Sequence, residues 1–242
     1  MDHRNSSGHA EEIPKKRAGG PGTYGAAAMT HPARYPVPGA RHRAEQTIDR
    51  SRFICTVDRV SSPAEAQKLL REIHDELPDA THHCWAYLIG APGSTDRIGM
   101  SDAGEPHGTA GRPMLTVLQH SGVGDIAAIV TRYYGGTNLG TGGLVKAYGG
   151  TVQLALATMS RAERIDYVEI VVTVGYESIS ALQQMLPRFE SSSLSEEYGE
   201  RATFALRVPV AQAEALRTAL LDATSGRAEV ALRDPTSLEE PG

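Results

Sequence analysis

Cysteines, aromatic residues and long apolar runs are all scarce in this sequence, and each shortage excludes a class of protein. Two cysteines in 242 residues cannot form a disulfide framework. They suit a reducing compartment, and we expect a cytoplasmic protein. With one Trp and three Phe, the core must consist mainly of Val, Ile, Leu and Ala. No run of about 18 apolar residues is present, so we expect no membrane span, and we expect no secretory signal because its basic, apolar and small-residue pattern is missing.

The chain also lacks a concentration of positive charge. The net charge of −5 divides into +3 for residues 1–45, −2 for residues 46–160 and −6 for residues 161–242. Proteins that bind nucleic acids usually concentrate positive charge to neutralise phosphates. A nucleic-acid role would therefore require a local basic patch on an acidic segment.

Length and composition predict a soluble globular protein with one large or two ordinary domains. Residues 1–45 are rich in Gly, Pro, Ala, Arg and His and show no apolar periodicity. We expect them to be a disordered tail, in which Met29 is a candidate for the true first residue. Two folded domains are expected at 46–160 and 161–233, followed by a second tail at 234–242.

The first domain shows a regular alternation of strand and helix patterns. Ser62, Pro63 and Glu65 form a helix start, with a serine N-cap, a proline in the first turn and a capping-box glutamate. The most continuous apolar run, 125–133, predicts a buried central strand. The complete pattern is an α/β sandwich with strands at 51–57, 81–89, 97–100 and 125–133, and helices from Ser62 to before Pro78, from Thr109 or Gly111, and over 144–159.

The second domain follows a charged segment, 161–165, that we expect to be a linker. Its predicted elements alternate in the order βαββαβ, which is the ferredoxin-like pattern. The whole chain is therefore predicted to be an α+β protein of two domains. The strands of the second domain are expected at 167–174, 194–198, 202–208 and 228–232, and its helices at 178–186 and 211–223.

Glycine, in contrast, is concentrated in one part of the chain. Thirteen of the 25 glycines lie between Gly99 and Gly150. Glycine loses more backbone entropy on folding than other residues, so this density needs a reason. Three reasons are possible: the backbone needs positive φ angles, two backbone segments pack closely, or a ligand approaches the backbone closely. Because charged side chains are interspersed with these glycines, we predict that 101–148 forms the working surface.

A strand, a glycine-rich turn and a helix follow one another at 133–146. Free N–H groups at a helix N-terminus form an anion site when glycines let a ligand approach. The sequence does not match either of two nucleotide-binding motifs. Thr141 stands where the P-loop motif requires lysine, and Val145 stands where the dinucleotide-binding motif requires its third glycine. The turn could still contact a phosphate or nucleic-acid backbone through Arg132 and Lys146, or its glycines could serve only tight packing.

Asp102 and Glu105 form a pair of carboxylates in a loop of Gly and Pro. They could perform acid–base chemistry or hold Mg²⁺. They could equally cap the following helix and brace Arg112 or Arg132, and we favour this structural role.

A third candidate is the run His82, His83 and Cys84, with His107 further along the chain. In a strand, His82 and Cys84 share one face and His83 points to the other. Two of these side chains with His107 could in principle bind zinc. No fourth ligand is evident, so we predict a buried cysteine with ordinary histidines and no metal.

Four segments in this order and spacing resemble the Impact/YigZ family: SRFICTV, DATHHCWAYLIG, SDAGEPHGTAGRPML and VTRYYGGTNLGTGGLVKAYGG. The resemblance covers roughly 47–160, and 161–232 is similar to the C-terminal domain of bacterial YigZ-type members. It implies a ribosomal-protein-S5-domain-2-like α/β sandwich, shared with domain IV of elongation factor G. It also implies a ferredoxin-like second domain, similar to domains III and V of that factor.

The resemblance implies a role in translation, because eukaryotic members compete for an activator of a stress-responsive kinase. We expect a non-enzymatic, translation-associated regulator that binds RNA, the ribosome or a protein factor, without a cofactor. The alternative is an enzyme acting on a small phosphorylated or peptide-like substrate, with Asp102, Glu105 and His107 as acid–base groups. The expected binding surface consists of Asp102, Glu105, Thr109, Arg112, Arg132, Gly135, Gly136, Gly140, Gly142, Gly143 and Lys146.

Overall fold

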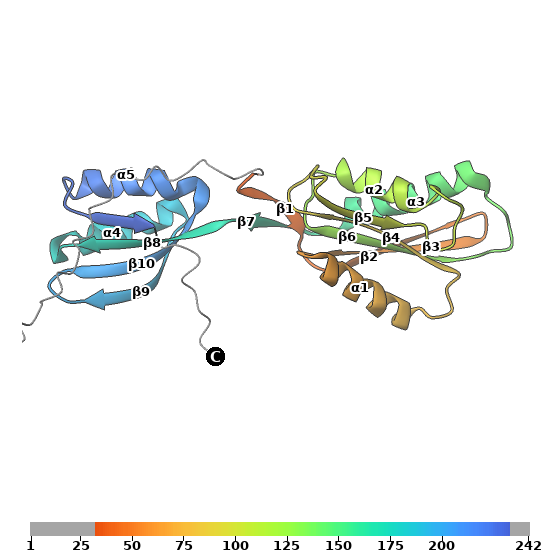
Figure 1. Cartoon of the computed structure of the whole chain (residues 1–242), viewed down its shortest axis with the longest axis horizontal. Helices are drawn as coiled ribbons and strands as arrows, with labels where there is room; N and C mark the ends of the chain where they lie inside the picture. The colour runs from red at the N-terminus through yellow and green to blue at the C-terminus, as the bar shows by residue number, and fades with distance from the viewer. Residues whose placement is uncertain (1–31, 233–242) are drawn as a thin grey trace, which may run out of the picture.

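The computed structural model describes residues 32–232 as two α/β units that lie end to end (Figure 1). A two-stranded ribbon of strands β1 (Arg34–Pro38) and β7 (Arg161–Ile165) connects the units. Each unit has its own hydrophobic core. The predicted α+β architecture of two domains is confirmed. Among the described helices, none is both long and apolar enough to cross a membrane.

The first unit is a five-stranded sheet in the order β2-β3-β6-β4-β5, in which every neighbouring pair is antiparallel. The segment predicted to be the central strand is indeed β6, and its first seven residues are buried. The strands are β2 (His42–Ile48), β3 (Ser51–Arg59), β4 (His82–Ile89), β5 (Arg97–Ser101) and β6 (Ile126–Tyr133).

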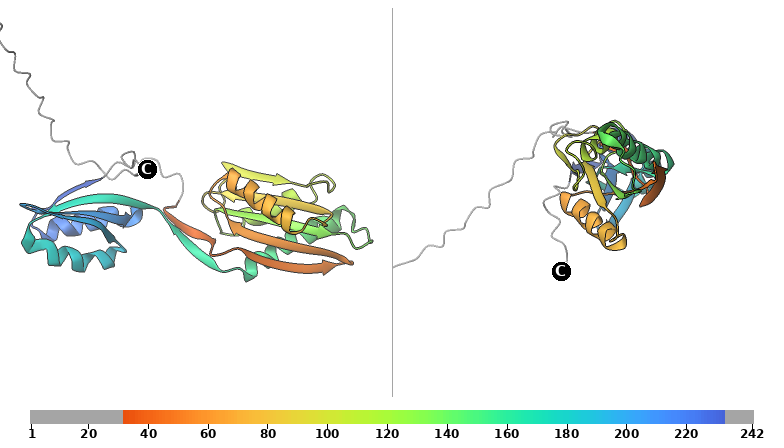
Figure 2. Two further views of the ribbon diagram at one scale, coloured as in Figure 1. Left: turned by 90° about the horizontal axis from the view of Figure 1, so that it is seen from below. Right: turned by 90° about the vertical axis from the view of Figure 1, so that its right-hand side faces the viewer.

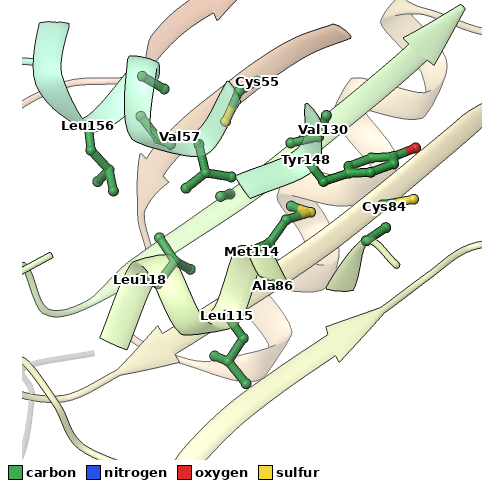
Figure 3. Packing of buried hydrophobic residues seen from close by; sticks show 14 of the residues in the cluster. Cys55, Val57, Cys84, Ala86, Met114, Leu115, Leu118, Val130, Tyr148 and Leu156 are labelled. Atoms are coloured by element: carbon green, nitrogen blue, oxygen red, sulfur yellow. The ribbon is translucent and has the colours of Figure 1, made fainter. Parts of the chain in front are cut away.

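Three helices cover this sheet: α1 (Pro63–Glu76), α2 (Gly111–Gln119) and α3 (Gly140–Thr158). α2 and α3 pack on one face, and α1 packs on the other (Figure 1). Figure 3 shows Met114 of α2 and Tyr148 of α3 among the packed side chains of this core. The predicted start of α1 is confirmed, because the Ser62 hydroxyl accepts a hydrogen bond from the Glu65 N–H at 3.2 Å.

The second unit is a four-stranded sheet in the order β11-β8-β10-β9, covered on one face by two helices (Figure 1). This strand order and the sequence βαββαβ define the predicted ferredoxin-like fold. The elements are β8 (Tyr167–Val174), α4 (Ile179–Met185), β9 (Ser192–Tyr198), β10 (Ala202–Pro209), α5 (Ala213–Ala223) and β11 (Glu229–Leu232), with 3₁₀ turns at Tyr176–Ser178, Leu186–Phe189 and Val210–Gln212.

Two expectations about the ends of the first domain are wrong. Strands β1 and β2 lie within residues 34–48, which overlap the expected tail, and Met29 lies outside the described residues. The expected linker at 161–165 is strand β7, which pairs with β1 in an antiparallel register (Figure 2). Each strand satisfies the backbone hydrogen bonds of the other, and neither shows a strong apolar alternation that would mark it alone.

A buried carboxylate, Asp125, fastens the ribbon to the first unit. It is fully buried and accepts hydrogen bonds from the Gly90 N–H at 2.8 Å and the Tyr35 hydroxyl at 3.0 Å. The Arg164 guanidinium pairs with the same carboxylate at 2.7 Å and also contacts the Tyr35 hydroxyl. Burial and the Asp125 charge raise the pKa of Tyr35 to about 12. One side chain therefore links β1, β7 and the start of β6.

Candidate functional site

The loop that precedes α2 and the end of β6 meet in a buried ion pair. Glu105 Oε1 lies 2.6 Å from a guanidinium nitrogen of Arg132 and accepts a hydrogen bond from the Tyr148 hydroxyl at 2.7 Å. Glu105 is 9% exposed and Arg132 is 5% exposed. The acidic loop and the strand end that leads into the glycine-rich turn therefore lie side by side.

Arg132 is enclosed by its neighbours on several sides. Its guanidinium carbon lies 5.4 Å from the ring centroids of both Phe53 and Tyr134. A second nitrogen donates to the Ser51 hydroxyl at 3.3 Å, and the buried Nε has no hydrogen-bond partner among the described residues. Arg132 thus lies in the interior, and it is not positioned as the exposed phosphate donor that the sequence suggested.

Asp102 caps the N-terminus of α2. One carboxylate oxygen accepts hydrogen bonds from the N–H groups of Ala110 and Gly111 at 3.0 and 2.8 Å, and the other accepts from Gly108 at 2.8 Å. Burial acts to raise the pKa of Asp102, but these three donors and nearby His107 outweigh it and hold the pKa below its usual value. These contacts give Asp102 the structural role favoured above.

The remaining residues of this loop also have local partners. Thr109 is buried, and its hydroxyl donates to the carbonyl of Pro106 at 2.6 Å. The Cys84 thiol donates to the carbonyl of Asp102 at 2.9 Å, and burial raises its pKa to about 12. His82 contacts the carbonyl of Ala103 through Nδ1 at 2.9 Å. His82 and Cys84, predicted to share one strand face, therefore both contact the loop.

His83 points to the opposite face of the sheet, where its Nδ1 lies 3.1 Å from the Thr131 hydroxyl. Burial, together with nearby His74, lowers the pKa of His83. Within residues 32–232, no group of three or more His, Cys, Asp or Glu side chains has a geometry that could hold a metal ion. The zinc alternative thus has no geometric support in the part of the chain that the structure describes.

The glycine-rich turn divides into residues with different roles. A Cβ atom at Gly135 would overlap the carbonyl of Arg50, so this glycine allows two backbones to pack closely. Gly136 and Gly140 have φ angles of 82° and 68°, which side-chain-bearing residues rarely adopt. A Cβ at Gly142 would meet nothing within 4 Å, and one at Gly143 would meet only the Leu139 side chain, at 3.0 Å.

Helix α3 begins at Gly140, four residues before the predicted start at Leu144. Gly140, Gly142 and Gly143 therefore belong to its first turn. Within residues 32–232 no side chain caps this turn, and its first three residues, Gly140 to Gly142, are exposed. The first N–H groups of a helix have no partner within the helix, so they can donate to a partner outside it.

A groove of about 660 Å³ lies between α2 and α3. Arg112 and Lys146, both exposed, line it from opposite helices. Its floor includes Gly149, where a Cβ atom would lie 3.7 Å from Val117, so the two helices approach each other closely at this point. This groove and the exposed first turn of α3 are therefore accessible to a partner.

Two glycine substitutions distinguish packing from free space in the turn. Gly135→Ala is expected to destabilise the protein by about 1–3 kcal/mol, because the new methyl group has to displace backbone atoms. Gly142→Ala, the matched control in the open first turn of α3, should stabilise by up to about 1 kcal/mol. Urea denaturation followed by the fluorescence of Trp85 in β4 measures both. Equal effects would contradict a packing role for Gly135.

Sequence reasoning brought Glu105 and Arg132 together but missed several of their partners. Tyr148 lies within the helix predicted over 144–159, but nothing local indicated that its hydroxyl would contact Glu105. Ser51, which also accepts a hydrogen bond from the Gly135 N–H at 3.2 Å, lies 84 residues away in the chain. Contacts over this distance leave no periodic signal in a single sequence.

Comparison with known proteins identifies both units. The Impact N-terminal domain model matches residues 49–156, and that of a domain of unknown function, DUF1949, matches 172–227. A solved structure described as that of a hypothetical protein aligns with a TM-score of 0.59 and 34% identity, over 84% of this chain and 98% of that chain.

Two bacterial relatives match over most of their length. IMPACT family member YigZ of Escherichia coli is 36% identical over 190 residues, covering 78% of this chain and 93% of the relative. An IMPACT family member of Haemophilus influenzae is 37% identical over 200 residues, covering 83% of this chain and 97% of the relative. The glycine-rich motifs, the two-unit architecture and this coverage together show that the chain belongs to the IMPACT family.

Proposed function

We propose that this protein is a cytoplasmic, translation-associated regulator that acts by binding and not by catalysis. The working surface consists of the α2/α3 groove and the exposed first turn of α3. One observation carries the proposal: Arg112 and Lys146 line the same groove from neighbouring helices. Lys146 lies less than two turns after the uncapped glycines that begin α3. Resemblance to a family with translational regulators supports RNA, the ribosome or a protein factor as the partner.

The geometry does not favour the enzymatic alternative. Both oxygens of Asp102 already accept backbone hydrogen bonds, and Glu105 is buried between Arg132 and Tyr148. His107 is fully exposed, 3.8 Å from the Asp102 carboxylate. The two carboxylates are therefore engaged by structural partners, and the one exposed group, His107, lies in open solvent, where nothing would hold a substrate between an acid and a base.

The test is direct binding of the full chain to purified ribosomes, total RNA and isolated translation factors. The double variant Arg112→Glu, Lys146→Glu is expected to weaken binding at least tenfold. Lys68→Glu is the matched control, because Lys68 is 73% exposed on α1, on the opposite face of the sheet. An exposed phosphate contact would also weaken as salt rises. Unchanged affinity in the double variant would contradict this surface.

A further inference from the structure

We propose that the α2/α3 groove binds an acidic, amphipathic peptide segment of a protein partner. The inference rests on the proposed function and specifies its partner class, selecting a protein over RNA. It follows from the length of the groove, the charge of its walls and the chemistry of its floor.

The groove continues along both helices. A second hollow of about 270 Å³ lies next to the first, and the two share Val117 and Gln153 in their walls. The second hollow ends at Arg161 and His120. Along α3 the combined groove runs from Val145 to Ala157, which at 1.5 Å per residue spans about 18 Å. A partner helix of about three turns would fill it.

The charge of the groove is of one sign, although the chain as a whole is acidic. Arg112, Lys146 and Arg161 lie in its walls, and none of the described lining residues is Asp or Glu. Among the described residues, no carboxylate forms an ion pair with these three cations, whereas Arg132 and Arg164 are both paired. Unpaired cations along an apolar groove complement a partner with carboxylates.

The floor is apolar, and the only aromatic ring among the described lining residues is the imidazole of His120, in the smaller hollow. Val145 is 41% exposed, and the other apolar contributors are Pro113, Val117, Leu156 and Ala157. Proteins that bind single-stranded nucleic acid stack successive bases on aromatic side chains. The described lining residues include no Phe, Tyr or Trp that would form such a platform. Aliphatic side chains at positions i, i+3 or i+4 and i+7 of an amphipathic helix fit such a floor.

Selection of a displayed library of random 14-residue peptides on the full chain tests the inference. Enriched peptides should be net acidic, with aliphatic residues at helical spacing. When they are synthesised and measured by fluorescence anisotropy, their affinity should fall at least tenfold for Arg112→Glu, Lys146→Glu. It should fall severalfold for Val145→Ser, and it should not change for Lys68→Glu. Enriched peptides that are basic, lack periodicity, or bind the double variant unchanged would overturn the inference.

The two proposals fail in different ways. If ribosomes or RNA bind in a groove-dependent manner but no acidic peptide is enriched or competes, the peptide inference is wrong and the proposed function stands. If acidic peptides bind the groove but ribosomes, RNA and translation factors do not bind the chain, the association with translation is wrong and the peptide site stands. Polyuridylic acid as competitor at physiological salt separates a phosphate-binding groove from a peptide-binding one, because non-specific attraction of phosphates to the cations is then largely screened.

Discussion

Arg132→Met is expected to destabilise the first unit by about 3–5 kcal/mol, since it removes one partner of a buried ion pair. The remaining Glu105 side chain is 4% exposed, so water cannot replace the lost cation. The Tyr148 hydroxyl would still donate to its carboxylate, and His82 Nε2 lies 4.0 Å from the same oxygen. The pair joins the loop before α2 to the end of β6, so the loop should lose protection against hydrogen exchange. Urea denaturation followed by Trp85 fluorescence gives the free energy of unfolding.

The double variant Glu105→Gln, Arg132→Met shows which of two causes destabilises Arg132→Met: the unpaired Glu105 carboxylate or the lost packing contacts of the guanidinium. If the buried charge causes the loss, the double variant should be more stable than Arg132→Met alone. If it is no more stable, the loss comes from the contacts of the guanidinium with Phe53 and Tyr134. Arg112→Met, on the exposed side of α2, should change stability by less than about 0.5 kcal/mol.

Asp125→Ala is expected to cost about 3 kcal/mol and to loosen the ribbon between the two units. It removes the acceptor of the half-buried Gly90 N–H and a partner of both Tyr35 and Arg164. Asp125 also has a φ angle of 45°, which alanine adopts less readily than aspartate. Hydrogen exchange at the amides of β1 and β7 should accelerate together with the loss of stability.

Asp125→Asn is the conservative comparison. Asparagine tolerates the same backbone conformation and retains a carbonyl oxygen, so it should recover a clear part of the stability lost in the alanine variant. Loss of stability without faster exchange in β1 and β7 would show that Asp125 stabilises the first sheet without holding the ribbon.

Sequence patterns predicted the fold wherever the signal was local. The start of α1 followed from Ser62 and Pro63, and the central strand β6 followed from its apolar run. In the second unit, all four strands and both helices were predicted, which was sufficient for the ferredoxin-like fold. In each case adjacent residues carry the periodicity or the capping chemistry that specifies the element.

The errors concern elements and roles that depend on distant residues. β1 contains two prolines and β7 is mostly charged, so each becomes a strand only by pairing with the other. The glycines at 140–143 suggested a loop, but they form the first turn of α3. Arg132 was expected at the surface, but Glu105, Ser51 and Tyr134 enclose it. Burial of a charge depends on which partners the fold brings to it.

The pairing of β1 with β7 also constrains the order of events during synthesis. Arg34 pairs with Ile165, so the first described strand cannot complete its ladder until about 130 more residues have been added. At about 5–20 residues per second, this delay lasts about 7–26 s. The five strands of the first sheet are all synthesised within that time. A chain still attached to the ribosome should therefore pass through a stage in which the first sheet is assembled but β1 is not yet paired with β7.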